Sequence, residues 1–143
     1  MASIASNPAG CNCLALRQAA RHVTQIYDRA MAPTGLRVTQ YSILARLNRA
    51  GSMTINALAA ELGMDRTTLG RNIRPLMRDG LITSVAARAD RRSKELRLTD
   101  DGRARVRDAF KHWSLAQAGF EGTFGVKRSK ALRALMREVT AAG

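Results

Sequence analysis

The sequence predicts a mainly α-helical fold that includes one pair of short β-strands. Apolar side chains recur at helical spacing through most of the 143 residues. Residues 94–98 instead alternate polar and apolar side chains, which is the period of a half-buried strand. Residues 81–87 read as a partner strand that leaves the preceding helix. The length fits one domain, or one domain with appended helices.

Positive charge is the most unusual property of the composition. The chain holds 24 lysine and arginine residues against 11 acidic ones, a net charge of +13 and a pI near 11.4. Such an excess indicates nucleic acid or an anionic membrane surface as a partner. No apolar run approaches the roughly 20 residues of a membrane span, and residues 1–10 do not resemble a signal peptide. We therefore expect a cytoplasmic protein whose partner is nucleic acid or an anionic membrane surface.

The N-terminal part predicts a tail and two helices. Residues 1–10 are small and polar and are expected to form a flexible tail. Residues 12–31 carry an apolar stripe at helical spacing, and Pro33 and Gly35 end that helix. Thr39 is expected to cap the second helix. Its inward side chains are Tyr41, Leu44 and Leu47.

Two helices separated by a glycine turn follow. Thr54 is placed to cap a short helix, and Gly63 can adopt the positive φ of a tight turn. Asp65 is placed to cap the next helix, which Gly80 ends as a C′ residue. Pro75 is expected to bend this helix near residues 72–74, because proline removes a backbone hydrogen bond.

The second of these helices has two unlike faces. One face carries Leu69, Ile73 and either Leu76 or Met77, and the other carries Thr67, Arg71, Arg74 and Arg78. A helix, a glycine turn and a second helix of this kind form a helix-turn-helix, whose second helix enters the DNA major groove. The alternative is an ordinary surface helix with solvated arginines. The adjacent strand pair with a basic turn at residues 88–93 favours DNA binding, because such a wing can lay arginine into the minor groove.

Three segments resemble the MarR family of bacterial regulators. They are Leu62-Gly63-Met64-Asp65-Arg66-Thr67-Thr68, Arg78-Asp79-Gly80-Leu81-Ile82, and Asp90-Arg91-Arg92 continuing to Leu98-Thr99 and Gly102. The resemblance runs from about Cys13 to the C-terminus. It implies a winged helix-turn-helix with N- and C-terminal dimerisation helices and a two-stranded β wing. It also implies that Arg92 is the minor-groove arginine and that Asp90 orients it.

Base readout is expected from the start of the recognition helix, because arginine bonds guanine and threonine can contact a thymine methyl group. The residues expected to read bases are Thr67, Thr68, Arg71 and Arg74. Phosphate contacts are expected from Arg66, Arg88, Arg91 and Lys94, and from helix N-termini at Thr39 and Thr54. Residues 66–107 hold 12 basic and 5 acidic side chains, so the charge gathers on this half.

The C-terminal residues predict two further helices. Thr99 or Asp100 begins a long one, residues 121–126 are expected to be a loop, and residues 127–142 form the last helix. The long helix carries a heptad-like seam of Val106, Phe110, Trp113, Gln117 and Phe120. We expect this seam to form a dimer interface, the alternative being packing within one chain. The predicted organisation is therefore a tail (1–10), a helical dimerisation region (11–34 and 99–143) and a DNA-binding domain (35–98).

No catalytic set is evident, and we expect neither an enzyme nor a bound metal or cofactor. The two histidines, His22 and His112, lack a metal-ligand spacing with the cysteines. Cys13-Leu14-Ala15-Leu16 resembles the start of the first helix in the organic-hydroperoxide-sensing branch of the MarR family, in which this cysteine is oxidised. Tyr27 falls where that branch carries a tyrosine that hydrogen-bonds the reactive thiolate. A helix N-terminus and Arg17 one turn on both favour a thiolate at Cys13. Val38 stands where a second tyrosine is usual, and a cysteine packed at a dimer seam is the alternative.

The function predicted from these observations is a homodimeric regulator that binds a pseudo-palindromic operator on double-stranded DNA. It is expected to be a repressor that a small ligand or thiol oxidation releases. The resemblance implies a ligand pocket between the dimerisation helices and the DNA-binding lobe, and His22, Tyr41 and Trp113 are its candidate lining. Two rivals remain: an architectural DNA-binding protein without an effector, and a thiol enzyme that uses Cys13.

Overall fold

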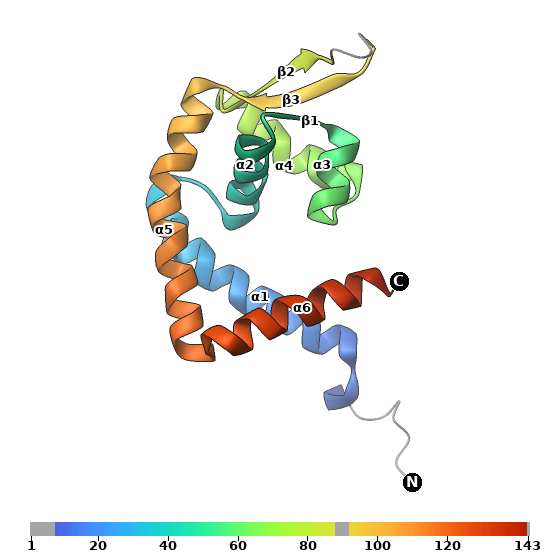
Figure 1. Cartoon of the computed structure of the whole chain (residues 1–143), viewed down its shortest axis with the longest axis vertical. Coiled ribbons are helices and arrows are strands. Elements are labelled where there is room, and N and C mark those ends of the chain that lie inside the picture. The colour runs from blue at the N-terminus through green and yellow to red at the C-terminus, as the bar shows by residue number, and fades with distance from the viewer. Residues whose placement is uncertain (1–7, 88–91, 143) are drawn as a thin grey trace.

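The structure, a computed structural model, describes residues 8–87 and 92–142 (Figure 1). Its helices are α1 (Asn12–Met31), α2 (Val38–Ala50), α3 (Ile55–Leu62), α4 (Arg66–Arg78), α5 (Asp100–Phe124) and α6 (Val126–Ala141). Its strands are β1 (Ser52–Thr54), β2 (Ile82–Ala86) and β3 (Lys94–Leu98), and short 3-10 turns lie at Pro8–Gly10 and Ala32–Thr34. The mainly helical class with a strand pair after α4 is confirmed.

The elements gather into a lobe and a helical frame. Figure 1 shows α2, α3, α4 and the sheet together at one end, while α1 and α6 cross at the other end. The long helix α5 runs along one side between them. The core lies in the lobe and continues onto α5 through Val106 and Ala109. Its fully buried side chains include Ile43, Leu44, Leu47, Leu58, Leu69 and Leu76.

The sheet has three antiparallel strands in the order β1-β3-β2. The wing strands pair with Ile82 opposite Leu98, and β1 pairs on the other side of β3 with Met53 opposite Leu96. The sequence did not predict β1, because three residues are too few to show an alternating pattern. This strand ties the start of α3 to the wing, and Ser52 Oγ donates to Glu95 Oε2 at 2.8 Å.

The predicted beginnings of α3 and α4 are confirmed. Thr54 Oγ1 accepts from the Ala57 N–H at 3.1 Å, and Asp65 Oδ1 accepts from the Thr68 N–H at 2.7 Å. Gly63 between the helices is left-handed, with φ +65°. Helix α4 continues through Pro75 as one element.

The predicted cap of α2 was wrong, and in α4 the structure selects Leu76 over Met77 for the apolar face. Helix α2 begins at Val38 after Arg37, so Thr39 lies in its first turn and does not cap it. Asp28 of α1 supplies the cap instead, because its Oδ1 accepts from the Val38 N–H at 2.8 Å. In α4, Met77 is 41% exposed, since Leu76 already fills the apolar face at 1% exposure.

The expected loop at residues 121–126 was also wrong. Helix α5 continues to Phe124, and Gly125 alone, with φ +108°, separates it from α6. The glycines in this stretch suggested a loop, but Gly122 sits within the helix. At the corner, the Arg128 guanidinium lies 4.2 Å from the centroid of the Phe124 ring.

Much of the α5 seam packs within the chain. Val106 is buried in the lobe core, the Trp113 ring stacks on Tyr41, and Gln117 Oε1 accepts from the Tyr27 hydroxyl. The alternative of packing within one chain therefore holds for these positions. Large apolar side chains remain exposed elsewhere on α1, α5 and α6: Leu14, Leu16, Phe110, Leu115, Val126, Leu135, Met136 and Val139. None of the described helices is both long and apolar enough to cross a membrane.

Candidate nucleic-acid interface

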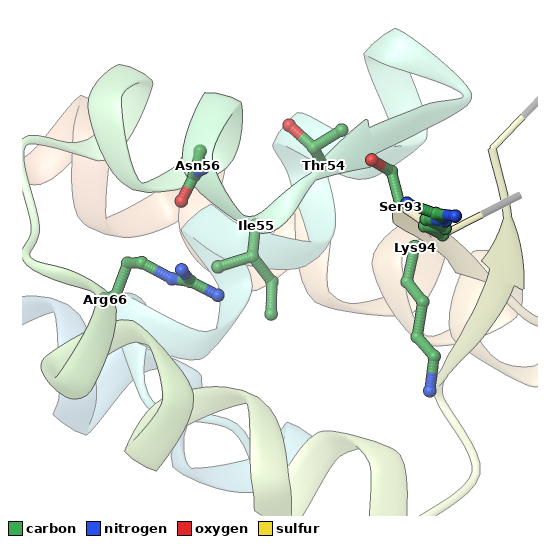
Figure 2. Close-up of a pocket in the computed structure, with 7 residues that line it drawn as sticks. Thr54, Ile55, Asn56, Arg66, Ser93 and Lys94 are labelled. Carbon is green, nitrogen blue, oxygen red and sulfur yellow. The ribbon is translucent and has the colours of Figure 1, made fainter. Parts of the chain in front are cut away.

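A concave, basic surface lies where α3, α4 and the wing meet. A cavity of about 390 Å³ is lined by Thr54, Ile55, Asn56, Arg66, Arg92, Ser93 and Lys94. Four of these, Thr54, Arg66, Arg92 and Lys94, belong to the predicted DNA-binding set. Figure 2 shows that Arg66 comes from the start of α4 and Lys94 from the wing, on either side of Ile55. The fold thus brings together residues that lie up to 40 positions apart in the sequence.

The charges and backbone of this cavity suit an anion. Arg66, Arg92 and Lys94 are cationic, and among the described residues no acidic side chain lines the cavity. Ile55 and Asn56 are the first two residues of α3, where the helix dipole and free backbone N–H groups also favour negative charge. A concave wall of this kind matches a phosphate backbone better than a neutral ligand.

The recognition helix α4 turns its predicted polar face outward. Leu69, Ile73 and Leu76 are buried, whereas the opposite side chains are exposed. The exposed residues are Arg66, Thr67, Thr68, Arg71, Arg74 and Arg78. This arrangement leaves the arginines free to reach a surface placed against the helix.

Thr68 has a structural task in addition to its predicted contact with DNA. Its hydroxyl donates to Asp65 Oδ2 at 2.9 Å, and its backbone N–H donates to Asp65 Oδ1. The hydroxyl proton is therefore engaged, and the side chain can offer a base its methyl group or an acceptor oxygen. The hydrogen bonds from Thr68, first through its backbone and then through its side chain, hold the pKa of the Asp65 carboxyl below 3.8.

The tip of the wing lies outside the described residues. The predicted contacts Arg88, Asp90 and Arg91, and the predicted pairing of Asp90 with Arg92, fall there. The two wing strands stay paired up to this tip, because Ala86 pairs with Lys94 and the Ala87 N–H donates to the Ser93 carbonyl at 2.9 Å.

Two residues that line the basic cavity were not predicted, and one predicted phosphate contact, Thr39, lies outside the cavity and stays a prediction. Thr39 lies on α2 and is not among the residues that line the basic cavity. Asn56 and Ser93 do line it and were not predicted. Asn56 lies in the first turn of α3, and Ser93 directly precedes Lys94. Their positions beside predicted phosphate contacts could have identified them from the sequence.

The candidate ligand residues divide between two cavities. Tyr41 and Trp113 stack with their ring centroids 6.2 Å apart in a cavity of about 420 Å³ between α2, α3 and α5. Arg46 and Glu61 on its rim form an ion pair of 3.2 Å. His22 instead lines a separate cavity at the α5–α6 corner. The prediction of one pocket for all three was wrong, because α1 runs past the far end of α5.

The redox candidates are not brought together within the chain. Cys13 is exposed in the first turn of α1, and Cys11 caps that helix by accepting from the Leu14 N–H at 3.4 Å. Tyr27 lies 14 residues along the same helix, about 21 Å away at 1.5 Å per residue. The Tyr27 hydroxyl donates to Gln117 Oε1. The pKa of this hydroxyl is raised, first because it is partly buried and second because the negative charge of Glu121 lies nearby. Arg17 is exposed one turn after Cys13.

The exposure of both cysteines also excludes burial of Cys13 as a packing residue inside one chain. Across the described residues, no group of three His, Cys, Asp or Glu side chains is arranged to hold a metal ion.

The comparisons with known proteins agree with this geometry. The sequence model of the MarR family matches residues 34–93. The HTH-type transcriptional regulator PetP of Rhodobacter capsulatus is 38% identical over 56 residues, which cover 39% of this chain. That match spans about a third of the length of PetP, 34%.

Solved structures extend the likeness to nearly the whole chain. The M. tuberculosis transcriptional regulator MosR, in a complex with DNA, is 40% identical with a TM-score of 0.76, over 91% of this chain and 98% of its own. The repressor CouR, bound to a 23-mer DNA duplex, shares the fold with a TM-score of 0.83 at 24% identity, over 98% of this chain and 99% of its own. The family model matches residues 34–93, and MosR is 40% identical over almost its entire length. The chain therefore belongs to the MarR family of winged helix transcriptional regulators.

Proposed function

We propose that the protein is a homodimeric repressor that binds a pseudo-palindromic operator on double-stranded DNA. The observation that carries this proposal is the continuity of one basic surface, from the exposed arginines of α4 to the cavity of Arg66, Arg92 and Lys94. An arginine-bearing helix suits the major groove, and the adjacent cations suit the flanking phosphates. The DNA complex of MosR, 40% identical, supports the same partner.

The proposal assigns the two ends of the chain to dimerisation. The helical region of residues 11–34 and 99–143 exposes apolar side chains such as Leu135 and Val139. A second copy would cover them, while residues 35–98 bind DNA. Residues 1–7 of the expected tail lie outside the described residues. A two-fold dimer presents two copies of α4 to half-sites about 10 base pairs apart. The chromosome is then the target, which makes the cytoplasm the expected location.

The operator itself can be found with a random pool of 40-base-pair duplexes selected by rounds of binding to the full chain. At physiological salt, we expect a selected palindrome to bind at least about 10³-fold more tightly than its scrambled version. A ratio near one would identify an architectural DNA-binding protein instead. The salt dependence of both affinities separates phosphate contacts from base readout.

Release of the operator is proposed to follow one of two routes. A small planar ligand can enter the cavity of Tyr41 and Trp113, which lies between the lobe and α5, so that binding would change how the two parts sit together. Oxidation of the exposed Cys13 thiol is the other route, with Cys11 as a neighbouring thiol.

A hydroperoxide titration separates the two routes. Operator-bound wild type, Cys11→Ser and Cys13→Ser proteins are treated with an organic hydroperoxide, and DNA release is followed by fluorescence anisotropy. Release from wild type and Cys11→Ser, together with retention by Cys13→Ser, supports the thiol route. Retention by all three leaves the cavity of Tyr41 and Trp113 as the effector site, and turnover of peroxide by free protein would instead indicate a thiol enzyme.

A further inference from the structure

Thr99 joins the end of the recognition helix to the beginning of the long helix. Its hydroxyl donates to the Gly80 carbonyl at 2.6 Å and accepts from the Gly102 N–H at 3.0 Å. Its backbone N–H also donates to the Leu81 carbonyl at 3.1 Å. Gly80 follows the last turn of α4, and Gly102 lies in the first turn of α5. The Thr99 side chain thus links Gly80, just after α4, to the first turn of α5, although the whole wing lies between them in the sequence.

The α4 side of this junction is firmly attached to the recognition helix. The Gly80 N–H donates to the Met77 carbonyl at 3.0 Å, and the Leu81 N–H donates to the Leu76 carbonyl at 2.9 Å. These two hydrogen bonds cap the C-terminus of α4. Gly80 adopts φ +74°, and Leu76 is buried in the lobe core. A shift of the Gly80 carbonyl would therefore carry the end of α4 with it.

The α5 side of the junction leaves no space for movement. A Cβ atom at Gly102 would lie 2.1 Å from the Leu81 carbonyl oxygen and 3.3 Å from Leu98 Cβ. The first turn of α5 therefore touches the backbone that leaves α4. Arg103 on the same turn donates to the Leu98 carbonyl at 3.2 Å, which fixes α5 to the end of β3 as well.

We propose that Thr99 and Gly102 are positioning residues for DNA recognition, which fix α4 to α5 and so set the spacing of half-sites that the dimer accepts. This inference rests on the proposed homodimeric function. One base pair advances the target by about 3.4 Å and turns it by about a tenth of a helical turn. A junction that yields by a few ångströms would therefore let the recognition helices accept wrong spacings.

The test uses the palindrome selected from the random duplex pool, together with versions whose central spacer is one base pair shorter or longer. The proteins are wild type, Thr99→Val, Thr99→Ser and Gly102→Ala, all as full chains. Thr34→Val is the matched control, because Thr34 Oγ1 also donates to a carbonyl, of Met31 at 2.6 Å, and accepts from an N–H, of Leu36 at 3.1 Å. Thr34 lies between α1 and α2, away from α4.

We expect wild type, Thr99→Ser and Thr34→Val to prefer the selected spacing by about tenfold or more, and Thr99→Val to discriminate by about twofold. Thermal melting should fall by similar amounts in Thr99→Val and Thr34→Val, since each loses two hydrogen bonds. Gly102→Ala is expected to shift the preferred spacing, because its Cβ must displace α5 from Leu81. If Gly102→Ala does not fold, Thr99→Val decides.

A Thr99→Val protein that discriminates among spacings as wild type does overturns the inference. So does an equal loss of discrimination in Thr34→Val, because the effect would then reflect general stability. A wild type that binds the selected and scrambled duplexes equally overturns the proposed function itself, and that result appears before any variant is compared.

Discussion

The DNA-reading lobe and the helical frame differ in how completely each buries its own apolar side chains. The lobe encloses a core in which Leu44, Leu58 and Leu69 have no exposed surface. In contrast, Met31 is the one buried residue of α1 and Ser129 the one buried residue of α6, both of which the structure describes fully. The lobe therefore buries its apolar side chains within one chain, whereas the frame leaves large apolar side chains exposed, as the proposed dimer requires.

Truncating matched leucines in the two regions should give the largest contrast. Leu69→Ala is expected to lower the free energy of unfolding by about 2–5 kcal/mol, because it leaves a cavity in the closed lobe core. Leu135→Ala, at a side chain that is 54% exposed, should cost less than about 0.5 kcal/mol in dilute protein. Urea denaturation at two protein concentrations measures both. A Leu135→Ala loss that grows with concentration would show that a partner copy covers this position.

Charges on the exposed face of α6 test the frame directly. Leu135→Asp combined with Val139→Asp should convert a dimer to a monomer and weaken operator binding by at least about a hundredfold, because two half-sites are no longer held together. Thr140→Asp adds a charge at a polar position of the same helix and serves as control. Light scattering reports the mass, and a double variant that remains dimeric would place the interface elsewhere.

The lobe was predictable from local sequence because its signals are local. Thr54, Gly63 and Asp65 mark the helix boundaries through their own chemistry, and the apolar stripe of α4 sits within one helix. The alternation in residues 94–98 likewise identified β3. Arg66 and Lys94, predicted separately as phosphate contacts, line one basic cavity because the helix-turn-helix and the adjacent wing lie side by side.

The errors fall where a contact from a distant residue decides the outcome. Asp28 reaches from α1 to cap α2, so the local signal of Thr39 was misleading. The partner of β1 is the distant wing strand β3, and Trp113 stacks on Tyr41 of the same chain. His22 was assigned to the wrong cavity for the same reason, because the crossing of α1 over α5 cannot be read from either helix alone.

Arg71→Ala probes readout by the lobe at an intermediate size of effect. The expected cost is about 1–3 kcal/mol on the selected operator, with relaxed preference at one base position. Lys111→Ala on α5 removes the same charge from an exposed position away from the basic cavity and should change the affinity much less. Both variants are titrated against operator and scrambled DNA. An equal loss for Arg71→Ala on the two duplexes would make it a phosphate contact.

The smallest expected effect is the pH dependence of the N-terminal cap of α4 in the lobe, compared with that of α1 in the frame. Asp65 caps α4 through a carboxylate bonded to both the N–H and the hydroxyl of Thr68, whereas Cys11 caps α1 through a weakly accepting sulfur at 3.4 Å. Because the folded-state pKa of Asp65 is lowered, its contribution is present above the ordinary pKa near 3.8 and is lost as the pH falls through the lower folded value. Amide exchange in the first turn of α4 should therefore accelerate in that acid range. The first turn of α1 should show no corresponding step, since it holds no carboxylate.

Asp65→Asn provides the control for that pH step. Asparagine also caps helices, so α4 should still form, but the acid-dependent change in exchange at Thr68 should disappear. The carboxyl titration of Asp65 can be followed by NMR in parallel, with a midpoint expected below 3.8. A midpoint at or above 3.8 would mean that the hydrogen bonds from Thr68 do not favour the charged carboxylate. The advantage of Asp65 over Cys11 as a cap would then come from the geometry of its hydrogen bonds rather than from a preference of those bonds for the charged carboxylate.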